Sequence, residues 1–361
     1  MAGTDARRFE ALDSLRGIAA LIVLIYHLSM TYGGFNLYSR RMIPIRIFFA
    51  GQDAVFIFFA LSGFVLFLSM EKRDDFAYFP YIVRRMIRLY IPLAVTVLIS
   101  ALLYFFVQPV PIIDASMWLN SAGWTDTPDA STLTGHLALL DPDRFQSLNS
   151  VMWSLVHEIR ISIIFPLLAF SITKSPRITV LLTAFISAMC FIFFDQPHSG
   201  NFIDVFHTGR YLFLFSAGAY LAHVRSQICQ FMAERSPWPM LITAWALLSV
   251  FGSLAPLAAT IAAILVLTAS FASKGVRHAL SWPVLIWLGR ISYSLYLVHM
   301  LVILTFMHTL SEQAPHATLL ALMFIFSIVI AELFYRLVER PSMSIGRRAA
   351  AWTKRLTAAT S

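Results

Sequence analysis

The sequence has few charged residues. Asp, Glu, Lys and Arg make up 13% of its 361 residues, about half the share found in soluble globular domains. Hydrophobic residues make up 58%, and the mean hydropathy is +0.73. Apolar runs near the roughly 20 residues that cross a bilayer core recur along the chain. This composition excludes an ordinary soluble domain and indicates a polytopic membrane protein.

Cysteine is also scarce, and no internal repeat is evident. The two cysteines, Cys190 and Cys229, imply no disulfide framework. Internal repeats mark many secondary transporters. The net charge of +8 does not indicate nucleic-acid binding, because a surplus of Lys and Arg in a membrane protein usually marks its cytoplasmic loops.

The apolar runs predict an all-α fold, a polytopic transmembrane helix bundle of about ten spans. The expected spans are Leu15–Tyr32, Ala54–Met70, Leu89–Val107, Val151–Ile172, Thr179–Phe194, His207–Val224, Met240–Ser253, Leu257–Ala272, Ile291–Leu310 and Ala317–Val338. The seventh and eighth are short, and only three residues separate them.

The basic residues predict how these spans are oriented. With the N-terminus inside, most Lys and Arg fall in cytoplasmic segments, whereas acidic residues collect in the outer loops. This asymmetry predicts that both termini are cytoplasmic. We expect residues 1–345 to form the transmembrane domain and residues 346–361 a basic cytoplasmic tail. The longest loop, residues 108–150, is expected outside, where it is long enough to cover a polar acceptor.

Ionisable residues inside a membrane are costly, which makes them candidate functional residues. Arg16 and His27 both lie in the first expected span. On a helix their spacing places them on one face, ~16 Å apart along the axis. Arg16 then lies at the cytoplasmic interface and His27 past the middle of the membrane. The alternative is that the Arg16 side chain merely extends to the membrane interface and that His27 is a packing residue with satisfied hydrogen bonds.

The fourth span carries Glu158 and Arg160. By helix rise Glu158 lies ~10–12 Å below the outer edge, close to the depth expected for His27. A carboxylate near a buried imidazole fixes its tautomer and stabilises the imidazolium. Glu158 and Arg160 are two residues apart and cannot face each other. The alternative is a charge network that holds the helices together.

Arginines and polar residues in other spans complete the candidates. Arg85 and Arg88 open the third span one helical turn apart, which suits either a phosphate clamp or a topology anchor. The ninth span places Tyr296 and His299 in its inner half. Asp53 lies at the outer end of the second span and Ser62 lies within it. For both residues, a role in helix packing is at least as good an explanation as a role in chemistry.

Several motifs, taken in order, resemble those of acyltransferase family 3, the bacterial membrane O-acyltransferases. They run from Asp13 to Pro341 and are "LDSLRGIAALIVLIYH", "FIFFALSGFVL" with Asp53 just upstream, "RRMIR", "MWSLVHEI", "ISYSLYLVH" and "VERP". Many relatives carry a C-terminal extracytoplasmic hydrolase-like domain. This chain resembles the stand-alone membrane form, without that domain.

The resemblance implies transfer of an acyl group, often acetyl, from cytoplasmic acyl-CoA to a hydroxyl of a glycan or related acceptor. It implies that acyl-CoA is a co-substrate and that no cofactor or metal is bound permanently. The expected catalytic residues are His27 and Glu158. The expected donor-binding residues are Arg16, Arg85 and Arg88. The expected substrate-binding residues are Asp53, Ser62, Trp153, Tyr296 and His299.

The expected mechanism uses His27 as a general base on the acceptor hydroxyl, with Glu158 orienting His27 or binding the acceptor. An acyl-histidine intermediate is the competing route. The expected location is the bacterial inner membrane. The expected partners are acyl-CoA, a glycan or lipid-linked saccharide as acceptor, and membrane lipids, with no nucleic-acid partner. Succinyl transfer and a macrolide or lipid acceptor are alternatives within this class. A transporter or flippase is the rival from another class, because intramembrane His, Glu and Arg also build transport pathways.

Overall fold

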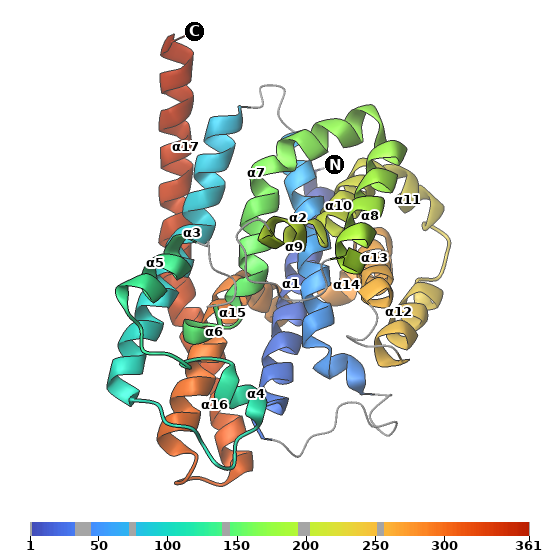
Figure 1. Ribbon diagram of the computed structural model, residues 1–361. Coiled ribbons are helices and arrows are strands. Elements are labelled where there is room, and N and C mark those ends of the chain that lie inside the picture. Colours follow the sequence, from blue (N-terminus) through green and yellow to red (C-terminus); the bar gives the residue numbers. More distant parts are fainter. Residues whose placement is uncertain are drawn as a thin grey trace.

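A computed structural model shows the protein as a bundle of helices (Figure 1). It describes residues 2–32, 45–71, 77–138, 145–193, 203–250 and 256–360. Within these ranges the chain forms helices and no strand, and its one β contact is an isolated bridge between Tyr32 and Ala115. The predicted all-α fold is confirmed.

The helices follow one another along the whole described chain. In order they are α1 (Ala2–Ser29), η2 (Arg46–Phe49), α2 (Gly51–Glu71), α3 (Tyr78–Val107), α4 (Met117–Ser121), α5 (Ala130–Ala138), α6 (Phe145–Leu148), α7 (Met152–Lys174), α8 (Pro176–Phe193), α9 (Ile203–Gly209), α10 (Leu212–His223), α11 (Arg225–Phe231), α12 (Trp238–Val250), α13 (Pro256–Ala272), α14 (Lys274–Leu280), α15 (Pro283–Leu310), α16 (His316–Phe334), η5 (Tyr335–Glu339) and α17 (Arg340–Thr360). Of these, η2 is a 3-10 helix and η5 a π-helix.

Seven of the described helices are long and apolar enough to cross a membrane. They are α1, α2, α3, α7, α8, α15 and the continuous helix that begins with α16. These seven correspond to the first five and the last two of the ten predicted spans, except that Phe194, at the end of the fifth, lies outside the described residues. The chain is therefore a multi-pass membrane protein.

The other three predicted spans correspond to shorter helices. The sixth is interrupted at Arg210 and Tyr211, between α9 and α10. The seventh is the 13-residue α12, and residues 251–253 at its end lie outside the described ranges. The eighth is α13, which bends by 91° into α14. Helices this short rise less than the roughly 30 Å of a bilayer core, so by length the described chain has seven spans, or eight with the bent pair.

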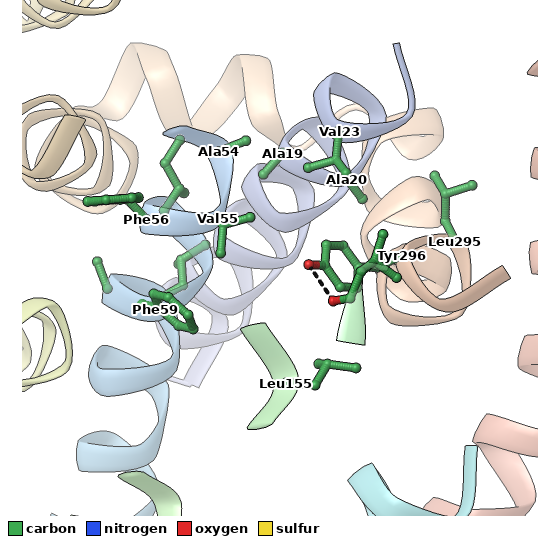
Figure 2. Close-up of a cluster of buried hydrophobic side chains, with 14 of the residues drawn as sticks. Ala19, Ala20, Val23, Ala54, Val55, Phe56, Phe59, Leu155, Leu295 and Tyr296 are labelled. Carbon is green, nitrogen blue, oxygen red and sulfur yellow. Dashed lines mark hydrogen bonds between the residues drawn. The ribbon is translucent and has the colours of Figure 1, made fainter. Parts of the chain in front are cut away.

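Helices α1, α2 and α15 form the centre of the bundle. Helices α1 and α15 run parallel with an offset of 272 residues, because Gly17 meets Gly289 and His27 meets His299. A methyl group on Gly17 would lie 2.6 Å from the backbone nitrogen of Gly289. Small residues allow such close helix contacts. Figure 2 shows Ala20 on the face of α1 that is turned toward Tyr296 of α15.

The chain between α3 and α7 brings α4 to the end of the bundle where α1 ends (Figure 1), and we call this end the opposite face. This stretch was predicted as a loop over residues 108–150, and it contains the short helices α4, α5 and α6. The backbone nitrogen of Ser116 donates to the carbonyl oxygen of Thr31 at 3.0 Å. The hydroxyl of Ser116 donates to the carbonyl oxygen of Met30 at 2.5 Å. These bonds attach α4 to the end of α1.

The start of α1 and the end of α17 lie at the other end of the bundle, which we call the terminal face (Figure 1). From His316 to Leu356 the chain is one 41-residue helix, about 61 Å long at 1.5 Å per residue. That is twice the thickness of a bilayer core. The predicted tail, residues 346–361, is thus helical as far as Thr360, and Gly346 packs against the backbone of Arg84 in α3.

Candidate active site

His27 and His299 form a hydrogen-bonded pair where α1 and α15 run side by side. Atom Nδ1 of His27 lies 2.8 Å from Nε2 of His299. Atom Nδ1 of His299 lies 2.8 Å from the backbone carbonyl oxygen of Leu295. His299 is fully buried and His27 half-buried. The fold thus joins the predicted base to a residue that the sequence offered only as a substrate contact.

These hydrogen bonds determine the tautomers of the two rings in their neutral form. A carbonyl oxygen only accepts, so Nδ1 of His299 carries the proton of that ring and Nε2 of His299 is its acceptor. Nδ1 of His27 must then donate to it, which leaves Nε2 of His27 without a proton. That nitrogen has the free lone pair that a general base or a nucleophile needs.

Trp118 of α4 covers the other side of the His27 ring. The ring centroids of His27 and Trp118 are 5.3 Å apart, and the ring planes differ by 7°. The rings of His27 and His299 have centroids 5.0 Å apart and planes that differ by 16°, as expected for a hydrogen bond between two ring edges. The sequence predicted a loop over residues 108–150 that is long enough to cover a polar acceptor, but it carried no signal that Trp118 is the residue in contact with His27.

Glu158 forms a buried ion pair with Arg85. Its Oε1 accepts from Nη2 of Arg85 at 2.5 Å and from the hydroxyl of Ser62 at 2.9 Å. Nε of Arg85 donates to the hydroxyl of Ser162 at 3.1 Å, and that hydroxyl donates to the carbonyl oxygen of Glu158. The network therefore ties α2, α3 and α7 together.

The expected orienting contact between Glu158 and His27 is not formed. His299 takes that place, and the carboxylate of Glu158 bonds to Arg85 and Ser62 instead. The predicted depth of Glu158 explains the error. Glu158 lines a cavity together with Arg16, which is eleven residues before His27 on α1, so Glu158 lies nearer the terminal face than His27 does.

This internal cavity lies between α1, α2, α7 and α15. Its volume is about 30 Å³, enough for one or two water molecules. Its polar lining comes from Arg16, Ser62, Ser154, Glu158, Ser292, Tyr293 and Tyr296. The cavity thus brings together four of the predicted site residues, two from the helices α1 and α15 that carry the histidine pair.

Tyr296 lies between the cavity and the histidine pair. Its ring packs edge-on against His299, with centroids 6.0 Å apart. Its hydroxyl is 2.6 Å from the hydroxyl of Ser154 and donates to the carbonyl oxygen of Val151 at 3.0 Å. The dashed line in Figure 2 marks the hydrogen bond of Tyr296. Tyr296 therefore borders both the cavity and the histidine pair.

Arg88, the second arginine of the predicted pair, also faces a buried carboxylate. Electrostatic interactions link it to Glu339 and Glu158, and to Arg16 and Arg85. Glu339 lies on the π-helix η5, is 2% exposed, and accepts from the hydroxyl of Ser294 at 2.6 Å. π-helical turns are frequent at functional sites. In the sequence, Glu339 stands out only as part of the motif "VERP".

Comparison with known families decides the class of this site. A family model described as an acyltransferase domain, that of acyltransferase family 3, matches residues 9–336. The chain belongs to acyltransferase family 3. Membership makes it a membrane acyltransferase of the O-acetyltransferase-like type, and it supports the enzyme over the rival transporter.

Two relatives in this family are named acyltransferases. The chain is 26% identical to the acyltransferase MdmB of Streptomyces mycarofaciens, over 94% of this chain and 93% of that protein. It is 25% identical to the O-acetyltransferase PaAT-1 of Phomopsis amygdali, over 51% of this chain and 45% of that protein. The chain thus spans less than half the length of the fungal relative. No solved structure matches the chain.

Two of the expected substrate contacts of this acyltransferase have recorded partners other than the histidine pair. Asp53 is buried in the first turn of α2, where its electrostatic partner is Arg46. The ring of Trp153 packs against His157 and Tyr211, with centroids 6.0 and 5.9 Å away. Among the residues that the structure describes, no group of three or more His, Cys, Asp and Glu is placed to hold a metal ion.

Proposed function

We propose that this acyltransferase moves an acyl group, acetyl in the first instance, from acyl-CoA to a hydroxyl of a cell-envelope glycan or lipid-linked saccharide in a bacterial inner membrane. The observation that carries the proposal is the unprotonated Nε2 of His27, which the hydrogen bonds from Leu295 through His299 leave available. An acceptor hydroxyl must lose its proton as it attacks a thioester, and a positioned imidazole takes such a proton efficiently.

In the proposed reaction, Nε2 of His27 takes the proton of the acceptor hydroxyl while the hydroxyl oxygen attacks the thioester carbonyl. The carbon–sulfur bond then breaks, and the CoA sulfur leaves and receives the proton from His27. The products are an ester and free CoA. His299 accepts from Nδ1 of His27 throughout and so supports the imidazolium. Transfer through an acyl-histidine uses the same lone pair and is the second route.

The donor is proposed to enter from the terminal face. Arg16 lines the internal cavity, and the rise from Arg16 to His27 along α1 is about 16 Å, the length that the thin pantetheine arm would have to cover. Arg85 and Arg88 are proposed to stabilise the helices along this route through their electrostatic interactions with Glu158 and Glu339. Because each arginine has a buried carboxylate nearby, little of their charge is left for phosphates.

The acceptor is proposed to enter from the opposite face, beside Trp118. Flat aromatic rings are common partners of apolar ligand surfaces, and Trp118 already stacks on His27. Helix α4 is attached to the end of α1 through Ser116. Because Trp118 of α4 covers His27, a small shift of this segment would expose the His27 ring. Asp53 and Trp153 are proposed as secondary acceptor contacts.

Mass spectrometry of envelope glycans tests the reaction. Glycans from cells that produce the wild-type protein should carry an added acyl mass, and His27→Ala should lower that acylation by about 10²–10⁴-fold. The two proteins must be present at equal levels in the membrane. Unchanged acylation in His27→Ala cells would contradict a role for His27.

Donor dependence separates the enzyme from a transporter. In liposomes, the wild-type protein should release free CoA only when acyl-CoA and acceptor are both present. If His27→Ala protein moves a saccharide across the liposome membrane without any acyl-CoA, transport is the activity and the proposed function is wrong.

A further inference from the structure

A second and larger cavity lies at the terminal face, where α10 leads into α11 and α13 bends into α14. Its volume is about 960 Å³, near the upper end of the range for small-molecule sites. One wall is α11, the following turn and the start of α12, and the other wall is the end of α13 and all of α14. The histidine pair and the Arg85–Glu158 network do not line it.

The lining of this cavity is positively charged. It contains Arg235, Lys274 and Arg277 and no acidic residue. Lys274 and Arg277 are one helical turn apart on α14, so both side chains lie on one face. Lys274 is exposed and has no hydrogen-bond or ion-pair partner among the described residues. Lys274 thus differs from Arg85, which is paired with Glu158 inside the bundle.

An aromatic surface and a thiol complete the lining. Trp238, at the start of α12, is 66% exposed and forms part of the wall, so one face of its indole is available to stack on a flat base. Cys229 of α11 also lines the cavity, and its thiol donates to the carbonyl oxygen of Phe271 at 3.8 Å. The other cysteine, Cys190, is buried in α8.

The cavity adjoins the proposed donor path. Helices α13 and α14, which form one of its walls, both pack against α1, the helix that carries Arg16. Arg225, at the start of α11, pairs with Glu71 at the end of α2, which fixes the other wall to the centre of the bundle. A ligand with its anionic end in this cavity therefore has α1 beside it.

We propose that this cavity binds the nucleotide end of the acyl donor, with the phosphates on Lys274, Arg277 and Arg235 and the adenine on Trp238. The pantetheine arm then runs beside α1 to the cavity lined by Arg16. The proposal rests on the proposed function, because it takes acyl-CoA as donor. It adds a separate binding site for the part of the donor that undergoes no chemistry.

Protection of Cys229 tests binding without any acyl transfer. Purified protein in phosphatidylcholine nanodiscs is alkylated with a maleimide, and mass spectrometry measures the modification of Cys229 and of the buried Cys190. Adenosine 3′,5′-bisphosphate, the nucleotide end of CoA, should slow alkylation of Cys229. Lys274→Glu should weaken this protection about ten-fold in nucleotide concentration. Lys174→Glu makes the same change of charge at the exposed end of α7, outside the cavity, and should leave the protection unchanged.

Truncated donors test the same site in turnover. Lys274→Glu should raise KM for acetyl-CoA about ten-fold and leave KM for acetyl-pantetheine, which has no nucleotide, at the wild-type value. Trp238→Ala should act in the same direction. Equal effects on both donors, or equal effects of Lys274→Glu and Lys174→Glu, would overturn the proposal.

Two further outcomes are distinguishable. If phosphatidylglycerol in the nanodiscs protects Cys229 and the nucleotide adds nothing, the cavity binds lipid headgroups and the proposal is wrong. If the nucleotide protects Cys229 but the wild-type protein transfers no acyl group from acetyl-CoA to envelope glycans, the proposed function fails while the nucleotide site stands.

Discussion

The contact between α1 and α15 has polar groups at two levels, and they differ in kind. Toward the opposite face, His27 and His299 are joined by one hydrogen bond, and the ring of Trp118 covers His27. Toward the terminal face, Arg16 shares a cavity with Glu158, which is paired with Arg85. The first site depends on a lone pair and the second on ionic charges.

The two kinds of contact respond differently to disturbance. An ion pair inside a bundle holds its partners firmly, because removing one partner leaves the other charge buried and unpaired. A hydrogen bond between neutral groups contributes less to stability, yet it can still decide which nitrogen of a histidine carries the proton. Under the proposed function, the arginine network contributes stability and the histidine pair performs the chemistry.

The largest expected effect is on stability, at Glu158. Glu158→Gln leaves the guanidinium of Arg85, whose side chain is 10% exposed, without its counter-charge. The free energy of unfolding in detergent should fall by about 3–5 kcal/mol. Replacing both residues, as Arg85→Met with Glu158→Leu, should recover much of the loss. A single-variant loss below about 1 kcal/mol would mean that the pair is solvated and does not hold the helices.

The next effect is on turnover, at His299. His299→Ala removes the acceptor for Nδ1 of His27 and should lower kcat by roughly 10- to 100-fold, equal to ~1.4–2.7 kcal/mol. KM for acyl-CoA should not change. His299→Asn keeps an oxygen that can accept and should restore part of kcat. If Ala and Asn lower kcat equally, or if only KM rises, His299 has no role in setting the tautomer of His27.

The smallest effect is expected at Trp118. Trp118→Ala removes the ring that stacks on His27, a contact worth about 0.5–1.5 kcal/mol. KM for the acceptor should rise by roughly 2- to 10-fold, and KM for acyl-CoA should stay the same. Trp118→Phe should lie between the two. A change in KM for acyl-CoA would place Trp118 on the donor side and reverse the proposed directions of entry.

The sequence predicted the parts of the site that depend on one helix. Arg16 and His27 were expected on one face, and both side chains meet residues of α15. Helical periodicity determines such a relation without any knowledge of neighbouring helices. The long apolar runs likewise predicted the all-α membrane bundle, because a bilayer requires them.

The parts that depend on packing between helices could not be predicted in this way. The predicted depth of Glu158 was counted by helix rise from the expected end of its own span. A depth along one helix does not reveal which residue of a neighbouring helix Glu158 contacts. The contact of His27 with His299 requires that α1 and α15 run parallel in one register. Trp118 and the cavity at α14 have no periodic signal, because turns and bends bring their residues together.

The separation of the two histidines along the chain has a consequence for biosynthesis. The residues that bond are 272 positions apart, and a ribosome adds about 5–20 residues per second. His27 therefore waits roughly 14 to 54 s in the membrane before its partner is even synthesised. During that interval nothing from α15 determines its tautomer, and a nascent chain that stops before α15 contains the proposed base but not the residue proposed to prepare it for catalysis.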